Sequence, residues 1–202
     1  MSERVGDVID QLAAIAPGSK LDAIRARRQV AREHAQKSYL ALFEPADFAG
    51  VPARERLAVA AFVAGLHAEP ATRDFYSAKL AAADNLLAAA VEAEIARGRT
   101  KGPYGAYPAG PLSSEDRTGL IYRVSDDGQR SLGARLAKAF EHVHLLVFRP
   151  RDAKPAALQA LLDAGWTTND IVTLSQLVAF LAFQIRAVGG LRALAAAPVR
   201  PV

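Results

Sequence analysis

Two histidines, in the run His142-Val143-His144, are the first residues whose type and spacing could do chemistry. Imidazole nitrogens are common zinc ligands, and side chains two positions apart point the same way on a β-strand. Residues 132–148, however, carry apolar side chains at helical spacing, and on a helix such positions lie about 200° apart. The two rings cannot then easily share one ion. We expect a capped or buried structural role for His142 and His144, with a metal site as the alternative.

A second polar group interrupts the most apolar stretch of the chain, residues 167–191. It consists of Gln176, Gln184 and Arg186. An apolar helix has little room for unpaired amide groups, so we expect these side chains to hydrogen-bond across a subunit interface. The alternative is that Arg186 binds a substrate carboxylate from an apolar wall.

The chain contains no cysteine. This absence excludes disulfides, thiolate metal sites and every mechanism with a thiol nucleophile or a redox-active thiol pair. The sequence also lacks a Gly-x-Ser-x-Gly elbow and the usual cofactor fingerprints, and Gly189-Gly190 has no phosphate-loop pattern. We therefore predict no cofactor.

The composition is that of a folded protein with a modest positive charge. Hydrophobic residues make up 51% of the 202 residues, and the net charge is +4. Arg25, Arg28 and Arg32 lie at helical spacing and would suit phosphate groups. Because neither an aromatic platform nor a nucleic-acid motif accompanies them, we expect a solvated face balanced by Asp22, Glu33 and Glu44, and no nucleic-acid partner.

The elements that must position these residues are helices. Hydrophobic periodicity predicts them over residues 5–15, 21–43, 54–66, 71–97, 132–148, 155–164 and 167–191. The last is apolar nearly all round, so it belongs at the domain centre or at a subunit interface. Thr167 and Asp170 form an approximate capping box at its start, and Gly189-Gly190 marks its end. Its polar interruptions argue against a membrane span, and without a secretory signal we expect a cytoplasmic protein.

Residues 98–133 are rich in Gly, Pro and polar side chains, and they predict a long loop. Such a loop is a lid, an oligomer contact or a disordered segment, and residues 120–124 could pair briefly as a strand. Its tyrosines indicate that it packs against another surface. The predicted organisation is a single all-α domain over 1–202, with helical halves at 1–97 and 134–195 joined by this loop.

Four stretches resemble the CMD-domain proteins of the carboxymuconolactone decarboxylase superfamily, which includes the AhpD-like alkylhydroperoxidases. They are IAPGSKLDAIRARR, HAQKSYLALFEPADFAG, GPYGAYPAGPL and ALLDAGWTTNDIVTLSQLVAFLAFQIRAVGGL. Together they cover most of the chain, and the last two are the most specific. The resemblance implies an AhpD-like helical bundle whose hairpins pack into compact homo-oligomers, with trimers or hexamers favoured.

The redox-active members of the superfamily use a relay of a Glu, a Cys-x-x-Cys pair at a helix start and a His one turn later. Laid on residues 51–80 without gaps, this pattern puts the Glu at Leu57 and the His at Tyr76. It puts the two cysteines at Glu69 and Thr72. All four groups are absent, so we predict no thiol-dependent hydroperoxidase activity. Members that decarboxylate lactones need no Cys pair, which leaves a Cys-free lyase or isomerase open.

The resemblance places the active pocket at His67, Glu69 and Tyr76. These residues are candidates for a general base, an acid and a hydrogen-bonding phenol. The alternative is structural: His67 ends one helix, Glu69 favours the start of the next, and Tyr76 fills a gap left by a smaller residue. We expect an AhpD-like protein that binds or converts a small molecule in a helical pocket. The alternative is a non-enzymatic oligomeric scaffold or interaction module.

Overall fold

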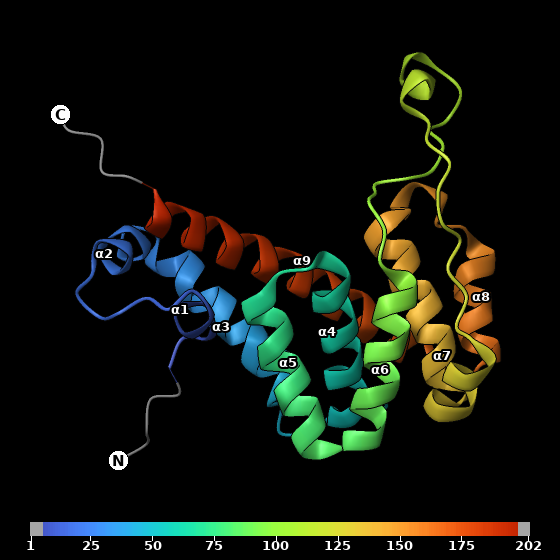
Figure 1. The fold of residues 1–202 in the computed structure, drawn as a ribbon, viewed down its shortest axis with the longest axis horizontal. Coiled ribbons are helices and arrows are strands. Elements are labelled where there is room, and N and C mark those ends of the chain that lie inside the picture. Colours follow the sequence, from blue (N-terminus) through green and yellow to red (C-terminus); the bar gives the residue numbers. More distant parts are fainter. Residues whose placement is uncertain (1–5, 198–202) are drawn as a thin grey trace.

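The computed structural model describes residues 6–197, and within that range the fold is all-α, with no β-strand. The α-helices are α1 (Val8–Leu12), α2 (Lys20–Ala26), α3 (Gln29–Phe43), α4 (Ala53–His67), α5 (Pro70–Ala83), α6 (Asn85–Gly98), α7 (Asp126–Phe148), α8 (Pro155–Asp163) and α9 (Thr168–Ala196) (Figure 1). Two short 3₁₀ helices are η1 (Pro111–Glu115) and η2 (Pro150–Asp152). The start that the sequence predicts for the first helix, at residue 5, lies outside the described residues.

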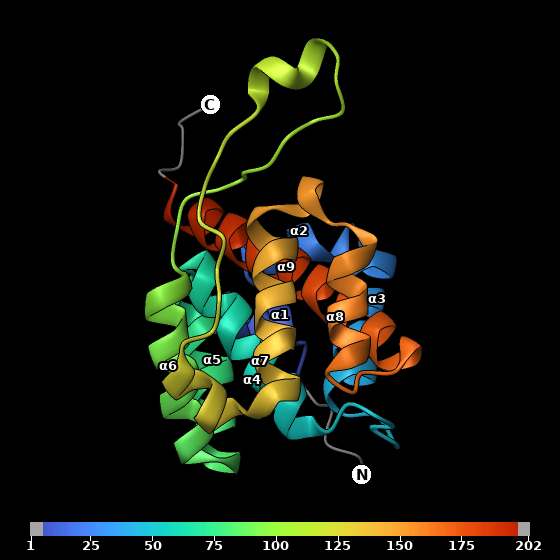
Figure 2. The same cartoon turned by 90° about the vertical axis from the view of Figure 1, so that its right-hand side faces the viewer.

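Helix α4 is the centre of the bundle. Every residue from Ala58 to Leu66 is buried, because α5, α6, α7 and α9 pack around this helix (Figures 1 and 2). Its small side chains let the neighbouring helices approach closely. Gly65 is the tightest example, since a Cβ there would lie 2.5 Å from the Cδ1 atom of Ile95 on α6. The central position that the sequence allowed for α9 therefore belongs to α4.

Helix α9 runs along the bundle and contacts α1, α3, α4, α7 and α8. Its predicted capping box is confirmed: the Asp170 amide donates to Thr167 Oγ1 at 3.2 Å, and the Thr167 amide donates to Asp170 Oδ2 at 3.0 Å. Its predicted end at Gly189-Gly190 is wrong, because the helix-forming residues that follow carry it to Ala196. By length and hydropathy α9 could cross a membrane, but half of its most apolar window is buried in the fold.

Two of the predicted helices are each broken in two. The helix predicted at 71–97 is interrupted at Asp84, whose backbone is extended and whose Oδ1 accepts a hydrogen bond from the Leu87 amide at 2.9 Å. This side chain caps α6, which stabilises the break. The helix predicted at 21–43 is interrupted at Arg28, where φ is −122° and ψ is 49°. The apolar periodicity continues through both breaks and therefore did not reveal them.

The predicted loop leaves the bundle as a long arm over residues 99–125 (Figures 1 and 2). One antiparallel bridge between Gly105 and Arg117 joins its two sides, and η1 forms its tip. The strand suggested at 120–124 is not formed. Helix α7 is interrupted at Gly133, whose φ of 77° and ψ of 159° are not helical. A short additional helix therefore precedes the one predicted at 132–148, and it is capped by the Ser125 hydroxyl, which accepts a hydrogen bond from the Gly128 amide.

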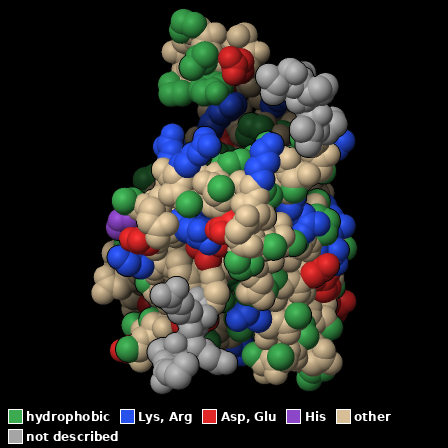
Figure 3. All heavy atoms as spheres, turned by 90° about the vertical axis from the view of Figure 1, so that its left-hand side faces the viewer, with side chains coloured by type: hydrophobic (Ala, Val, Ile, Leu, Met, Phe, Trp, Pro, Cys, Tyr) green, Lys and Arg blue, Asp and Glu red, His purple; other side chains and the backbone are tan. Residues whose placement is uncertain are grey.

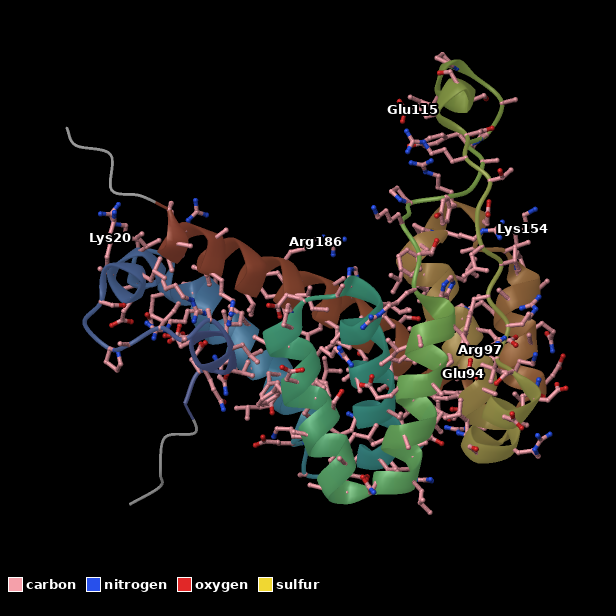
Figure 4. All side chains as sticks on the ribbon, in the orientation of Figure 1. Lys20, Glu94, Arg97, Glu115, Lys154 and Arg186 are labelled. Atoms are coloured by element: carbon pink, nitrogen blue, oxygen red, sulfur yellow. The ribbon has the colours of Figure 1, made fainter. Side chains whose placement is uncertain are left out.

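The return of the arm is held by a buried carboxylate between α6 and α7 (Figure 4). Glu94 is 1% exposed and accepts hydrogen bonds from the Tyr122 hydroxyl and the Ser125 hydroxyl, each at 2.5 Å. The Tyr122 ring stacks on His144, with the two centroids 4.8 Å apart. These contacts hold residues 121–123 against α7, where they help to line a cavity.

Candidate functional site

A cavity of about 460 Å³ lies between α7, α8 and residues 121–123 of the arm. Helix α8 forms one wall of the cavity, and it contributes only the small side chains of Ala156, Ala157 and Ala160 to the lining. The volume falls in the range of about 300 to 1,000 Å³ that is usual for small-molecule sites. The cavity is therefore large enough for a small ligand.

Both predicted metal candidates, His142 and His144, contribute to this lining. His144 has the structural role that was expected, since its Nε2 atom lies 2.9 Å from the Gly98 carbonyl oxygen. His142 is buried, and its Nδ1 atom has no hydrogen-bond partner. Burial lowers the pKa of both imidazoles, so both are neutral at pH 7. In residues 6–197, no group of three or more His, Cys, Asp or Glu side chains is arranged to hold a metal ion.

One end of the cavity carries a carboxylate that is shared between two cations. Glu141 accepts a hydrogen bond from Lys138 Nζ at 2.9 Å and another from Arg123 Nη1 at 3.2 Å. The Glu141 side chain is 8% exposed, whereas the Arg123 side chain is 70% exposed. One carboxylate cannot neutralise two cations, so this end of the cavity keeps an excess of positive charge.

The other end lies at the break between α7 and α8. Arg149 Nε donates to Asp152 Oδ2 at 2.7 Å, and this hydrogen bond lowers the pKa of the Asp152 carboxyl. Lys154 also lines this end of the cavity, and Figure 4 shows it beside the start of α8. Among the described residues it makes no ion pair within 4.0 Å. With neutral histidines, the charged side chains that line the whole cavity are four cations and two carboxylates. The site therefore favours an anion.

The pocket that the resemblance predicts around His67, Glu69 and Tyr76 is filled by Tyr76. This side chain is completely buried, and its hydroxyl donates to Gln184 Oε1 at 2.7 Å. Burial raises the pKa of the Tyr76 phenol well above its usual range, so the group is a hydrogen-bond donor and not a base. Gln184 was predicted at a subunit interface, but its carbonyl oxygen is satisfied within the chain.

The neighbouring candidates occupy the positions of the structural alternative. His67 is the last residue of α4, and Glu69 caps α5 because its Oε2 accepts a hydrogen bond from the Thr72 amide at 2.7 Å. Three buried polar atoms here lack a partner in the chain, namely His67 Nε2, Thr72 Oγ1 and Gln184 Nε2. Burial, and then the charge of Arg186, lowers the pKa of His67, so its ring is neutral. This polar cluster joins α4, α5 and α9 without an open cavity.

Gln176 and Arg186 do not join Gln184 in one site. Both side chains are exposed, whereas Gln184 is completely buried. Arg186 Nη1 donates to the Ala182 carbonyl of its own helix at 2.7 Å, and the side chain points away from the bundle (Figure 4). A role at a subunit interface therefore stays a prediction for Gln176 and Arg186.

Of the arginines that the sequence places at helical spacing, at positions 25, 28 and 32, the first and the last pair with carboxylates of α1, of α2 and of the residue before α1. Arg25 Nη1 donates to Asp7 Oδ1 at 2.6 Å and also pairs with Asp10. Arg32 pairs with Asp10 and with Asp22, the latter at 2.9 Å. Figure 3 shows side chains of both signs on this side of the molecule. Balancing by Asp22 was predicted, whereas the contributions of Asp7 and Asp10 were not. The predicted balancing by Glu33 and Glu44 is wrong, because among the described residues neither makes an ion pair within 4.0 Å.

We predict that Tyr76→Phe lowers the free energy of unfolding by about 1 to 3 kcal/mol, because it leaves the buried Gln184 oxygen without a donor. Urea unfolding monitored by circular dichroism measures this change. The double variant Tyr76→Phe with Gln184→Leu should recover most of the loss, since it removes both polar partners. A double variant as unstable as the sum of the two single variants would show that this hydrogen bond does not link α5 to α9.

The sequence did not predict that Lys138 and Lys154 would share a cavity, or that the alanines of α8 would form its wall. The available signal was the density of charges around residues 149–154. Comparisons with protein families, curated proteins and solved structures find no match for this chain. The relation to the AhpD-like proteins therefore rests on the sequence resemblance alone.

Proposed function

We propose that this chain is an AhpD-like protein without thiol peroxidase chemistry, and that it binds a small molecule in the cavity between α7 and α8. The observation that carries the proposal is a cavity of about 460 Å³ with an alanine wall and an excess of positive charge in its lining. The helical fold and the sequence resemblance support the AhpD-like part, and the absence of cysteine excludes thiol chemistry.

The lining fits a small carboxylate with an apolar body. Ile121, Leu145 and Ala157 offer apolar surface to the body of such a ligand. Lys154 offers an ammonium group that no carboxylate of the described residues neutralises within 4.0 Å. A cation beside an apolar wall binds a carboxylate more strongly than it binds a neutral amide of the same shape.

His142 is the group in this lining best suited to move a proton. A Cys-free lyase or isomerase needs a proton acceptor beside its substrate, and a neutral imidazole can serve as one at pH 7. Burial lowers the pKa of His142 and so keeps the ring in that neutral form. Turnover of a bound carboxylate would therefore depend on His142, whereas binding would depend on the cations and the alanine wall.

We predict that ligand-observed NMR with a panel of small carboxylates and their amides will show preferential binding of the carboxylates. Benzoate and benzamide are the first pair, because they share one shape and differ in charge. Ala160→Trp should abolish binding by filling the cavity, while Gln159→Trp, on the same helix but outside the lining, should not. Lys154→Ala should reduce the preference for carboxylates by about tenfold. Equal binding by Ala160→Trp and the unmodified protein would refute the site.

The second candidate is an oligomeric scaffold without a ligand. It is supported by the outer face of α9, where Val172 and Phe183 are about half exposed, at 51% and 50%. Exposed apolar side chains arranged along one helix face are typical of interaction surfaces.

A further inference from the structure

Six residues form an exposed stripe along α9, and we call them the α9 stripe: Val172, Gln176, Ala179, Phe183, Arg186 and Gly190. The other residues between 171 and 190 are buried or only partly exposed. The members follow one another at alternating steps of four and three, which is the spacing of the contact positions in a two-stranded coiled coil. Only one of them is charged, although the solvent-facing side of a helix is usually polar. The stripe therefore has the pattern of a helix-packing surface.

We infer that the α9 stripe packs antiparallel against the α9 stripe of a second copy of this chain, about a two-fold axis between Ala179 and Phe183. In such a pair the first residue of one stripe faces the last residue of the other, the second faces the fifth, and the third faces the fourth. Phe183 then faces Ala179 of the other copy, so a large side chain meets a small one. This contact occurs twice, because the interface has two-fold symmetry.

The remaining positions match in the same register. Val172 faces Gly190, which again sets a larger side chain against the smallest residue. Gln176 faces Arg186, and the amide oxygen of the glutamine can accept a hydrogen bond from the guanidinium group. In this one register, four positions pair a larger side chain with a smaller residue, and the other two pair polar side chains. Because the stripe is complementary to itself, we infer that its partner is a second copy of the chain.

A groove of about 270 Å³ lies beside the stripe. Phe183, Ala187 and Leu191 of α9 border it, and its other side combines apolar residues such as Ile24 of α2 and Ala35 of α3 with the side chains of Arg25, Arg28 and Arg32. The arm extends on the side of the bundle toward which Arg186 points (Figures 1 and 4). A copy seated on the α9 stripe would cover the groove and lie beside the arm. None of the stripe residues lines the cavity between α7 and α8, so this pairing does not depend on ligand binding.

The size match between Phe183 and Ala179 is tested by exchanging these two residues. Sedimentation velocity over a range of protein concentrations measures the mass of the assembly. The unmodified protein should form a dimer or a larger even-numbered assembly. Phe183→Ala and Ala179→Phe should each raise the dissociation constant at least about tenfold, one by a void and the other by a clash. The double exchange should return it to within a few-fold of the starting value. Leu86→Ala, which removes an exposed apolar side chain from α6, a helix that contributes no residue to the stripe or to the groove, should have no effect.

The register is tested by crosslinking, because the chain has no cysteine of its own. The variant with Gln176→Cys and Arg186→Cys should form intermolecular disulfides under mild oxidation. Each single variant should not, since equivalent residues of the two copies would lie about 15 Å apart along the helices, beyond the reach of a disulfide of about 7 Å. Circular dichroism of every variant confirms that the helices are intact.

Several results would overturn the pairing. One is an unmodified protein that remains monomeric at about 100 µM, well above the dissociation constants of stable dimers. Another is a trimer whose stability is unchanged by Phe183→Ala. A third is a double exchange as weak as the single variants, or crosslinking in the single variants. Partition of the unmodified protein, but not of Phe183→Glu, into phosphatidylcholine vesicles would assign the stripe to a lipid surface instead.

Discussion

Replacing Arg56 by methionine should lower the free energy of unfolding by about 4 kcal/mol or more, since it removes three hydrogen bonds from a charged donor, each of which contributes about 1.5 to 3 kcal/mol. Arg56 is 5% exposed, and it donates to the carbonyl oxygens of Leu42, Phe48 and Val51 at 2.7, 2.8 and 2.8 Å. Leu42 lies in the last turn of α3, and Phe48 and Val51 lie on the connection from α3 to α4. Methionine keeps much of the side-chain volume but leaves three carbonyl groups without their donor. Urea unfolding at pH 7 measures the loss.

Arg54 provides a matched control two residues earlier on the same helix. Its side chain is 56% exposed and makes one ion pair, with Asp84 at 2.7 Å. Arg54→Met should therefore change stability by no more than about 1 kcal/mol. Arg56→Lys should be nearly as damaging as Arg56→Met, because a single ammonium group cannot reach three carbonyls that a guanidinium fork spans. Equal effects at positions 54 and 56 would show that the connection does not depend on this fork.

The sequence predicted those parts of the fold that depend on local chemistry. Thr167 and Asp170 cap α9 as expected, and Pro155 stands in the first turn of α8, where its missing amide hydrogen is not needed. The break at Asp84 was missed because the apolar periodicity runs through it, and only the capping role of its carboxylate distinguishes it from an exposed helical residue. For α9 the sequence left the domain centre and a subunit interface open, because hydropathy does not reveal whether an apolar face meets the core or remains exposed.

The candidate site was predictable only in part. The sequence singled out Tyr76 and Gln184 for separate reasons, and nothing local indicated that they would meet across the 108 positions that separate them. The cavity depends on a further long-range contact, because Glu94 on α6 holds Tyr122 beside His144. Such pairings arise from tertiary packing, which periodicity and motif spacing do not encode.

Stability should decrease as the pH is lowered from 7.5 to 5.5. Burial lowers the pKa of His67, His142 and His144, so each ring stays neutral in the folded protein at a pH where it is protonated in the unfolded chain. The unfolded state then binds more protons, and acid favours it. The stabilisation is complete above the unfolded pKa of about 6.5 and is lost as the pH falls toward the folded values. Each histidine contributes a slope of at most about 1.4 kcal/mol per pH unit, and the three together at most about 4.

Urea unfolding at half-unit pH intervals measures this slope, and two single substitutions show its origin. His67→Asn should reduce the slope of stability against pH by the contribution of one buried histidine. His34→Asn, at an exposed position of α3, should leave the slope unchanged. The range ends at pH 5.5 because burial raises the pKa of Glu55, and proton uptake by that carboxyl in the folded state acts in the opposite direction. A flat profile between pH 7.5 and 5.5 would mean that water reaches the imidazoles. Those rings would then be protonated in place, and His142 could not remain the neutral proton acceptor that turnover in the cavity requires.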